Sequence, residues 1–294
     1  MEGKQTEIRK ITIKSKEYPK RLKKLSGMPK ELYVIGNLPE DNAPTAAVVG
    51  ARMCSAYGKR QAHCYAKVLA EYGIQVISGM ALGIDTQGHL GALEAQRTTY
   101  AVLGSGVDVC YPAANRKLYN QILETGGGII SEFPPGMPPK AGHFPARNRI
   151  ISALADVVLI VEARERSGSL ITADFALDQG KDVYALPGPV TSALSQGCHR
   201  LIRQGAGILI TPEELMDEWN LNRMQIGQKN NKNEKMLESP ERMVYSCLDL
   251  FPKGIDELMK ETELSISELM ERLITLELKG YAEEVSRNYY IRLL

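Results

Sequence analysis

Short apolar runs alternate with longer amphipathic stretches between residues 45 and 220, and this pattern predicts a repeated strand–helix order. β-branched runs bounded by turn residues are typical of buried strands, whereas apolar positions at helical spacing, as in 55–73, indicate crossover helices. Strands joined by helices pair in parallel, so we expect an open, doubly wound, mostly parallel α/β sheet. The expected strands lie at 46–50, 74–78, 99–103, 128–131, 156–163, 182–188 and 207–210.

A polar stretch divides the chain into two domains. Residues 221–234 contain almost no apolar side chains, so they cannot bury enough surface to offset the entropy lost on ordering. We therefore predict a linker over 221–234, between a larger domain at 45–220 and a smaller one at 235–294. Residues 1–44 are expected to form an approach segment to the first strand of the larger domain.

The smaller domain has the pattern of a winged helix. Ser265 and Glu268 form a capping box that opens a helix with leucines on one face, and Gly280 ends this helix before an alternating tail typical of a hairpin. Winged helices often bind duplex DNA through one recognition helix, which here would be the helix that follows Ser265. Here that helix is rich in glutamate, which is unfavourable against phosphates, so we favour a protein-contact or accessory role.

Composition removes several classes of function. The 294 residues carry 36 Lys and Arg against 35 Asp and Glu, a net charge of +1, so any site for a polyanion must be local. The five cysteines and four histidines show no metal-ligand spacing, and we expect neither a metal site nor a disulfide framework. No apolar run is long enough for a membrane span and no signal peptide is visible, so we expect a cytoplasmic protein.

Glycine- and serine-bearing turns follow four of the expected strands and lead into helices. Glycine permits close approach of the backbone, and a helix start offers free N–H groups, so these turns suit an anion, although glycine is also usual in any short turn. Val109 replaces the third glycine of a G-x-G-x-x-G fingerprint, and the chain has no G-x-x-x-x-G-K-[ST] motif, which disfavours dinucleotide binding and P-loop hydrolysis. The four turns are 49–58, 78–85, 103–112 and 163–174.

A proline-rich loop leads into a basic segment that holds Phe144, Arg147, Asn148 and Arg149. Guanidinium groups pair with phosphates, and an aromatic ring stacks on a nucleobase for about 1–3 kcal/mol, so this combination suits single-stranded DNA. In the other interpretation, Phe144 packs in the core and an arginine pairs with a carboxylate such as Glu132. We expect at least one of Arg147 and Arg149 to be structural in this way.

Many spaced motifs carry a resemblance to a known family. Residues 7–220 resemble the DNA-processing protein A family (DprA, also called Smf) through VGARMCSAYG, SGMALGIDTQGHLGAL, YAVLGSGVDVCYP, ISEFPPG, HFPARNRIISALAD, VLIVEA, SGSLITADFAL and GCHRLIRQGA. The family consists of cytoplasmic bacterial proteins with an extended Rossmann-like domain that bind single-stranded DNA, form homodimers and help load a RecA-type recombinase during natural transformation. The resemblance therefore implies a recombination mediator with no cofactor, no metal and no catalytic residues.

The family's DNA pocket can be transferred onto this chain residue by residue. Arg52 follows the first core strand, where a phosphate would also meet the helix start near Ser55. Many members begin with a small helical SAM-like domain, and we expect no full domain of this kind in residues 1–44. The positions that the resemblance implies for DNA binding are Arg52, Lys140, Phe144, Arg147 and Asn148, together with the main-chain N–H groups of Ser167, Gly168 and Ser169.

An enzyme is the alternative. SGSLITAD loosely resembles a turn of Rossmann-like nucleotide phosphoribohydrolases of the lysine-decarboxylase-like group, for which Asp174, Glu162 and Arg149 would surround a bound mononucleotide. This chain lacks the paired glycines and the glutamate of the P-G-G-x-G-T-x-x-E run of that group. We therefore favour DNA binding without catalysis.

Overall fold

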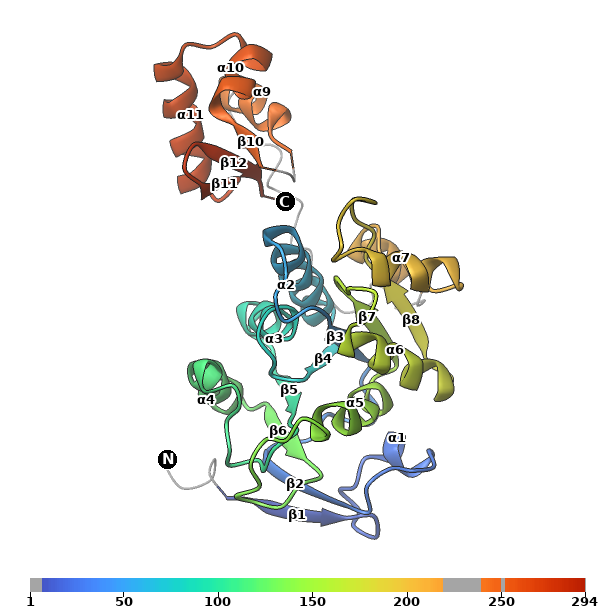
Figure 1. Ribbon diagram of the computed structural model, residues 1–294. Coiled ribbons are helices and arrows are strands. Elements are labelled where there is room, and N and C mark those ends of the chain that lie inside the picture. Colours follow the sequence, from blue (N-terminus) through green and yellow to red (C-terminus); the bar gives the residue numbers. More distant parts are fainter. Residues whose placement is uncertain (1–6, 219–238, 250–251, 294) are drawn as a thin grey trace. The chain divides into compact units, whose positions relative to one another are not determined.

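The computed structural model describes residues 7–218, 239–249 and 252–293 (Figure 1). The chain divides into two compact units, Met1–Arg223 and Met224–Leu294. The predicted linker at 221–234 lies outside the described residues. Within the described ranges, no helix combines the length and the apolar character that crossing a membrane requires.

A nine-stranded sheet forms the centre of the larger unit, with the strand order β1-β2-β6-β5-β4-β3-β7-β8-β9. Strands β3 to β9 pair in parallel, which confirms the mostly parallel α/β sheet. The predicted strand at 156–163 ends earlier, because Glu162 has a φ of 70° and leaves the extended conformation. The strands are β1 Arg9–Thr12, β2 Glu31–Gly36, β3 Thr45–Val49, β4 Gln75–Ser78, β5 Thr99–Val102, β6 Gly128–Ser131, β7 Val157–Ile160, β8 Asp182–Ala185 and β9 Gly207–Ile208.

The first two strands show that the N-terminal segment is part of this sheet and more than an approach to it. Strand β2 pairs antiparallel with β6, and β1 pairs antiparallel with β2. Leu32 and Val34 alternate with more exposed neighbours and are fully buried, so β2 contributes to the core. The same alternation is visible in the sequence, where it is a signal for a strand that the expected set of seven omitted.

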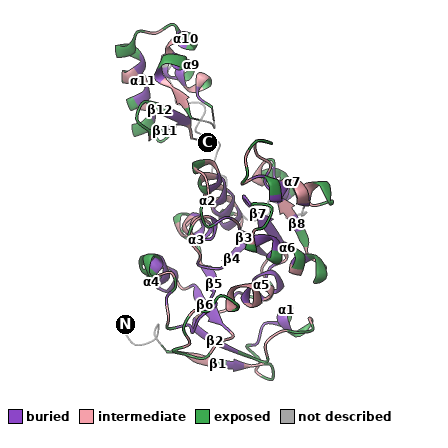
Figure 2. Ribbon diagram, in the orientation of Figure 1, coloured by how far each residue is buried: buried purple, intermediate pink, exposed green. Residues whose placement is uncertain are grey.

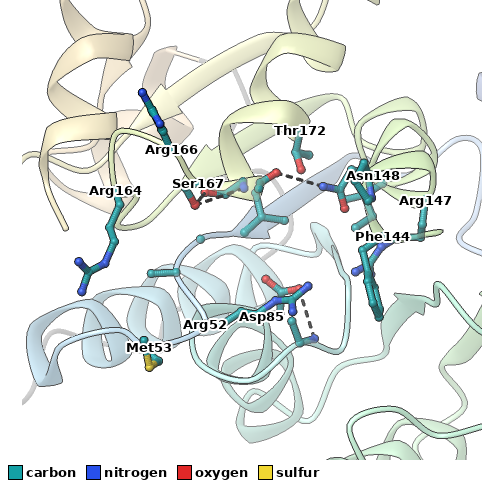
Figure 3. Close-up of a pocket in the computed structure, with 18 of the residues that line it drawn as sticks. Arg52, Met53, Asp85, Phe144, Arg147, Asn148, Arg164, Arg166, Ser167 and Thr172 are labelled. Carbon is teal, nitrogen blue, oxygen red and sulfur yellow. Dashed lines mark hydrogen bonds between the residues drawn. The ribbon is translucent and has the colours of Figure 1, made fainter. Parts of the chain in front are cut away.

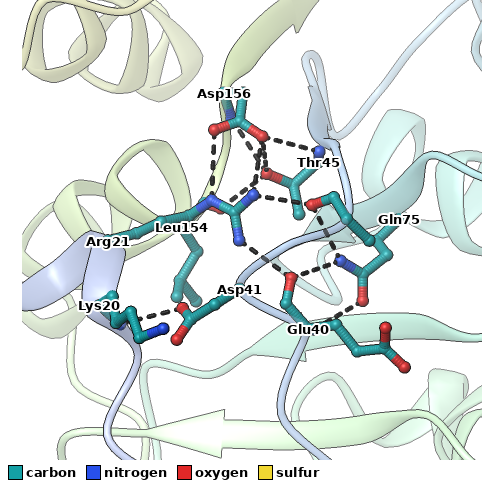
Figure 4. Close-up of polar contacts among 9 residues, drawn as sticks. Lys20, Arg21, Glu40, Asp41, Thr45, Gln75, Leu154 and Asp156 are labelled. Atoms are coloured by element: carbon teal, nitrogen blue, oxygen red, sulfur yellow. Dashed lines mark hydrogen bonds and ion pairs between the residues drawn. The ribbon is translucent and has the colours of Figure 1, made fainter.

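A polar cluster joins this N-terminal segment to the starts of two central strands (Figure 4). Arg21, in α1, lies 2.9 Å from the Asp156 carboxylate and also donates to the carbonyl oxygens of Glu40 and Ala43. Thr45 donates to Asp156 through its N–H and its hydroxyl, both at 2.9 Å. Burial alone would raise the pKa of Asp156, but these donors lower it below the ordinary value.

Helices cover both faces of the sheet (Figure 1). The side chains of α2, α3, α4 and α8 pack on one face and those of α1, α5, α6 and α7 on the other, so the strands are buried between two layers (Figure 2). Burial on both faces explains the nearly continuous apolar composition of the parallel strands. The helices are α1 Lys20–Lys23, α2 Ala56–Glu71, α3 Ile84–Glu94, α4 Arg116–Glu124, α5 His143–Leu154, α6 Gly168–Asp178, α7 Gln196–Arg203 and α8 Pro212–Glu218, with a 3-10 turn at Ala113–Asn115.

The C-terminal unit has the helix and hairpin order of a winged helix. Ser265 and Glu268 form the predicted reciprocal capping box, and Gly280 follows the helix end with a φ of 76°. Three leucines on one face of this helix, Leu269, Leu273 and Leu276, are fully buried. The elements are α9 Ser239–Cys247, β10 Lys253–Gly254, α10 Ile255–Thr262, α11 Ile266–Leu278, β11 Ala282–Ser286 and β12 Tyr289–Arg292, with the strand order β10-β12-β11.

Candidate nucleic-acid interface

A cavity of about 510 Å³ lies at the carboxyl ends of the central strands (Figure 3). Its walls come from the turns after β3, β4 and β7 and from the start of α5. Three of the four turns expected to form an anion site therefore meet here, whereas residues 103–112 do not line the cavity. Of the eight predicted site residues, Lys140 is exposed and lies outside the lining, and the cavity gathers the other seven, Arg52, Phe144, Arg147, Asn148, Ser167, Gly168 and Ser169.

An arginine and an aromatic ring meet on one wall of the cavity. The Cζ atom of exposed Arg52 lies 5.1 Å from the centroid of the Phe144 ring, a cation–π distance. The ring is half-buried and therefore belongs to the cavity wall rather than to the core. Tyr111 contacts it from the rim, with 5.7 Å between ring centroids. A Cβ atom on Gly104 would lie 2.9 Å from the Phe144 ring, so a glycine is needed there.

Arg147 has a different environment from Arg52. Only 3% of the residue is exposed, and its Nη1 donates to the carbonyl oxygen of Val102. Burial lowers the pKa of its guanidinium to about 10, and neighbouring Asp85 partly opposes this shift. A Cβ atom on Gly79 would lie 2.0 Å from Nη1, so the guanidinium occupies the space that the missing side chain leaves.

Two further titratable groups lie near Arg147. Asp85 accepts from the Ala81 N–H at 3.3 Å, and burial raises the pKa of its carboxyl, although Arg147 limits the rise. His89 is fully buried and bonds through Nδ1 to the Thr99 hydroxyl at 2.8 Å. Burial lowers the pKa of His89 to about 3, so its ring is neutral at physiological pH.

Arg149 forms an ion pair that stabilises the fold. Its Nη2 pairs with the Glu132 carboxylate, and both side chains are largely buried, so the expectation that one arginine of this segment is structural is confirmed. The backbone carbonyl of Arg149 also accepts from the side-chain amide of Gln179, the C-cap residue of α6. The ion pair and this hydrogen bond fix α5 against its neighbours, and Arg149 does not line the cavity.

The start of α6 forms another wall. Ser167 is the N-cap, its hydroxyl lies 2.8 Å from the Ser169 hydroxyl, and it accepts weakly from the Ser169 N–H at 3.4 Å. Asn148 reaches across from α5 and donates to the Gly168 carbonyl at 3.1 Å. A Cβ atom on Gly168 would meet nothing within 4 Å. The positive end of the α6 dipole therefore borders open space in the cavity.

The start of α2, by contrast, is already occupied by a carboxylate. Ser55 donates to Glu162 through its N–H at 2.9 Å and its hydroxyl at 2.5 Å. A Cβ atom on Gly58 would lie 2.3 Å from a Glu162 oxygen, which shows how closely the carboxylate packs on this turn. The idea that a phosphate meets the helix start near Ser55 is therefore wrong, because Glu162 takes that place.

Two arginines of the cavity were missing from the predicted set. Arg164 and Arg166 are exposed, and both line the wall formed by the turn after β7. The signal for them lies in the sequence itself, since both fall inside the turn 163–174 that was expected to border an anion. With Arg52 and Arg147 they make four arginines, whereas Asp85 is the one carboxylate among the described residues that line the cavity.

The three residues considered for a phosphoribohydrolase do not meet at this cavity. Glu162 is buried against Ser55, Arg149 pairs with Glu132, and exposed Asp174 is not part of the lining. Among the described residues that line the cavity, the one carboxylate is Asp85, which is buried beside Arg147 and accepts from the Ala81 N–H. The geometry therefore gives the hydrolase alternative no support.

Comparison with known protein families agrees with this arrangement. Residues 9–220 match the family model described as DNA recombination-mediator protein A. Residues 228–286 match the DprA winged helix domain, which confirms the winged helix in the C-terminal region.

Individual relatives cover most of the chain. Protein Smf of Escherichia coli (strain K12) is 37% identical over 286 residues, which are 95% of this chain and 76% of that protein. DNA processing protein DprA of Streptococcus pneumoniae (strain ATCC BAA-255 / R6) is 42% identical over 202 residues, 69% of this chain and 71% of that protein.

Two solved structures share the fold. The X-ray structure of DNA processing protein A from Streptococcus pneumoniae has a TM-score of 0.68 at 39% identity and covers 73% of this chain and 75% of its own. The structure of DNA processing protein A from Helicobacter pylori, described as having a unique single-stranded DNA binding mode, has a TM-score of 0.65 at 30% identity. It covers 72% of this chain and 96% of its own. The chain therefore belongs to the DNA recombination-mediator protein A family of DNA-processing proteins.

Proposed function

We propose that this chain binds single-stranded DNA in the cavity at the carboxyl ends of β3, β4 and β7. One observation carries the proposal: four arginines, the open N-terminus of α6 and the Phe144 ring line a single cavity. Among the described residues of its lining there is one carboxylate, and this lies beside Arg147. Arginines and helix N–H groups bind phosphates, whereas an aromatic ring stacks on an unpaired base, so the combination fits a single strand better than a free anion.

The roles of the residues follow from their exposure. Arg52 is accessible and takes a phosphate or stacks on a base beside Phe144, while buried Arg147 supplies positive charge from the cavity floor. Asn148 and the Ser167–Ser169 turn offer hydrogen bonds along the opposite wall. Lys140 stays in the proposal as an exposed cation of the preceding loop, which a longer strand reaches beyond the cavity.

The wider role that we propose is that of a cytoplasmic, homodimeric mediator, which protects incoming single strands and helps load a RecA-type recombinase during natural transformation. The family name and the single-stranded DNA binding described for the Helicobacter pylori relative support this role. The chemistry consists of binding and release without a cofactor. For the acidic winged helix we propose protein contact or an accessory task.

Fluorescence anisotropy of a labelled oligothymidine tests the DNA proposal. We expect wild type to bind the single strand in preference to a duplex of equal length, and Arg52→Glu to abolish binding by placing a negative charge beside the phosphates. Arg97→Glu is the matched control, because Arg97 is exposed but precedes β5, at the amino ends of the strands. Equal binding by wild type and Arg52→Glu, or none by wild type, would exclude this site.

A further inference from the structure

We propose that Arg164 and Arg166 form a second phosphate subsite, at the end of the cavity away from Phe144, so that the bound strand crosses the cavity instead of ending in it. This inference rests on the proposed binding of single-stranded DNA and assigns a part of the path to residues with no role so far. The first observation is position: Figure 3 shows Arg164 and Arg166 at one end of the cavity and Phe144 at the other.

The second observation is the charge of these two residues. Both are exposed, and within the described part of the chain neither makes an ion pair or a hydrogen bond with a carboxylate. The lining carboxylate, Asp85, is buried beside Arg147 and cannot neutralise a distant wall. Glu165 lies between the two arginines in the sequence and is also exposed, so the turn carries two positive charges and one negative charge. The net positive charge that remains attracts the phosphates of the same strand.

The third observation is that the turn is held at both ends. Ala163 donates its N–H to the Leu194 carbonyl at 2.7 Å and accepts from the Gly197 N–H at 2.8 Å. A Cβ atom on Gly197 would lie within 2.8 Å of the backbone oxygens of Ala163 and Arg164, so the two segments pack closely. At the other end Ser167 caps α6. The two arginines are thus presented by an anchored backbone, which limits the entropy lost when they bind.

The path that results has three parts. A base stacks at Phe144 beside Arg52, the next phosphate meets the α6 start at Gly168, and the following phosphate reaches Arg164 and Arg166. Met53, which is 78% exposed, lines the cavity between the Arg52 wall and the Arg164 wall and offers an apolar surface to an intervening sugar or base. A very short oligonucleotide fills only the first part, whereas a longer one engages all three.

The test compares Arg164→Ala/Arg166→Ala with a matched control, Arg97→Ala/Arg203→Ala. Arg97 and Arg203 are exposed, and both precede strands at the amino ends of the sheet, away from the cavity. Anisotropy is measured with oligothymidines of graded length across a salt series. For long oligomers we expect the cavity variant to lose roughly tenfold in affinity and its slope of log affinity against log salt to shrink by about 0.7 per lost phosphate contact. For the shortest oligomers we expect no change.

A charge-preserving variant distinguishes the loss of a phosphate contact from a disturbance of the turn that carries the two arginines. Arg164→Lys/Arg166→Lys keeps both positive charges, so we expect it to retain the salt slope of wild type even if affinity falls slightly. If the alanine variant matches the Arg97/Arg203 control in affinity and slope while wild type binds long oligomers, the subsite is wrong and the proposed function stands. If wild type binds no oligomer of any length, the proposed function fails and the subsite fails with it.

Discussion

The guanidinium of Arg52 lies over the ring of Phe144, with 5.1 Å between the Arg52 Cζ atom and the ring centroid. The two side chains come from segments more than ninety positions apart, the turn after β3 and the start of α5. One face of the ring is thus covered by an exposed cation. A nucleobase that reaches this face displaces the guanidinium, which then becomes free to pair with the adjoining phosphate.

Phe144→Leu tests the role of the ring, because leucine keeps apolar bulk but has no π-face. We expect single-stranded DNA affinity to fall by about 1–3 kcal/mol, the usual contribution of one stacked base. The measurement is anisotropy with oligothymidine and with an abasic oligomer of the same length. Phe144→Tyr is the control that retains the ring. An equal loss of affinity for the abasic oligomer would show that the ring supports the fold of the cavity and does not stack.

Arg149→Met is expected to separate stability from binding. The substitution leaves the largely buried Glu132 carboxylate without its cation, which we expect to lower the free energy of unfolding by about 3 kcal/mol. Arg149 does not line the cavity, so DNA affinity of the folded protein should be unchanged. Urea unfolding followed by circular dichroism and anisotropy at low temperature provide the two readouts. A variant of normal stability that binds DNA weakly would place Arg149 in the interface.

Gly79→Ala is expected to destabilise the protein through Arg147. The added methyl group would lie 2.0 Å from Nη1, and the guanidinium is buried with little room to move. Such overpacking costs about 1–3 kcal/mol, visible as a lower urea midpoint with an unchanged slope. Gly142→Ala is the control, because a Cβ atom there meets nothing within 4 Å. Equal midpoints for the two variants would contradict the close fit of Arg147 against Gly79.

The lowered pKa of His89 predicts how the free energy of unfolding changes with pH. Its pKa is about 3 in the folded state against 6.5 ordinarily, so below pH 6.5 the unfolded chain binds a proton that the folded chain does not. Stability from this group is therefore complete above pH 6.5 and is lost as the pH falls toward 3, by about 1.4 kcal/mol per pH unit. His89→Gln removes the titrating group and retains an amide that can bond to the Thr99 hydroxyl. Asp85 titrates in both proteins and contributes in the opposite direction, so subtracting the unfolding free energy of the variant from that of wild type cancels its contribution. A difference that does not vary with pH would refute the shift.

Much of the architecture was predictable because the parallel strands are buried on both faces and leave an uninterrupted apolar signal. The seven expected strands are all present, and the capping box at Ser265 lies where the sequence predicts it. Strand β2 was not among the seven expected strands, because its alternating pattern is short and the segment was expected only to lead into the sheet. Its pairing with β6, over ninety residues away, is a tertiary event that no local pattern encodes.

The site was harder to predict, because two arginines only two positions apart have different roles. Arg147 and Arg149 look alike in the sequence, yet one reaches the cavity floor and the other pairs with Glu132. Which of the two faces inward depends on the rotation of α5, and that rotation follows from packing against Gly79 and α6. Arg164 and Arg166 were overlooked because the recognised SGS motif begins at Ser167, directly after Arg166.

The carboxylate of Glu162, seated at the start of α2, has a consequence for how the Arg52 wall meets its ligand. Because the chain brings its own anion to this turn, the electrostatic surroundings of Ser55 are the same before and after DNA arrives. The turn needs no counterion from solution to hold its shape, and its order is established during folding and not during association. On this wall, the backbone of the turn is therefore held before DNA binds, and the adjustment on binding falls to the Arg52 side chain and to the strand.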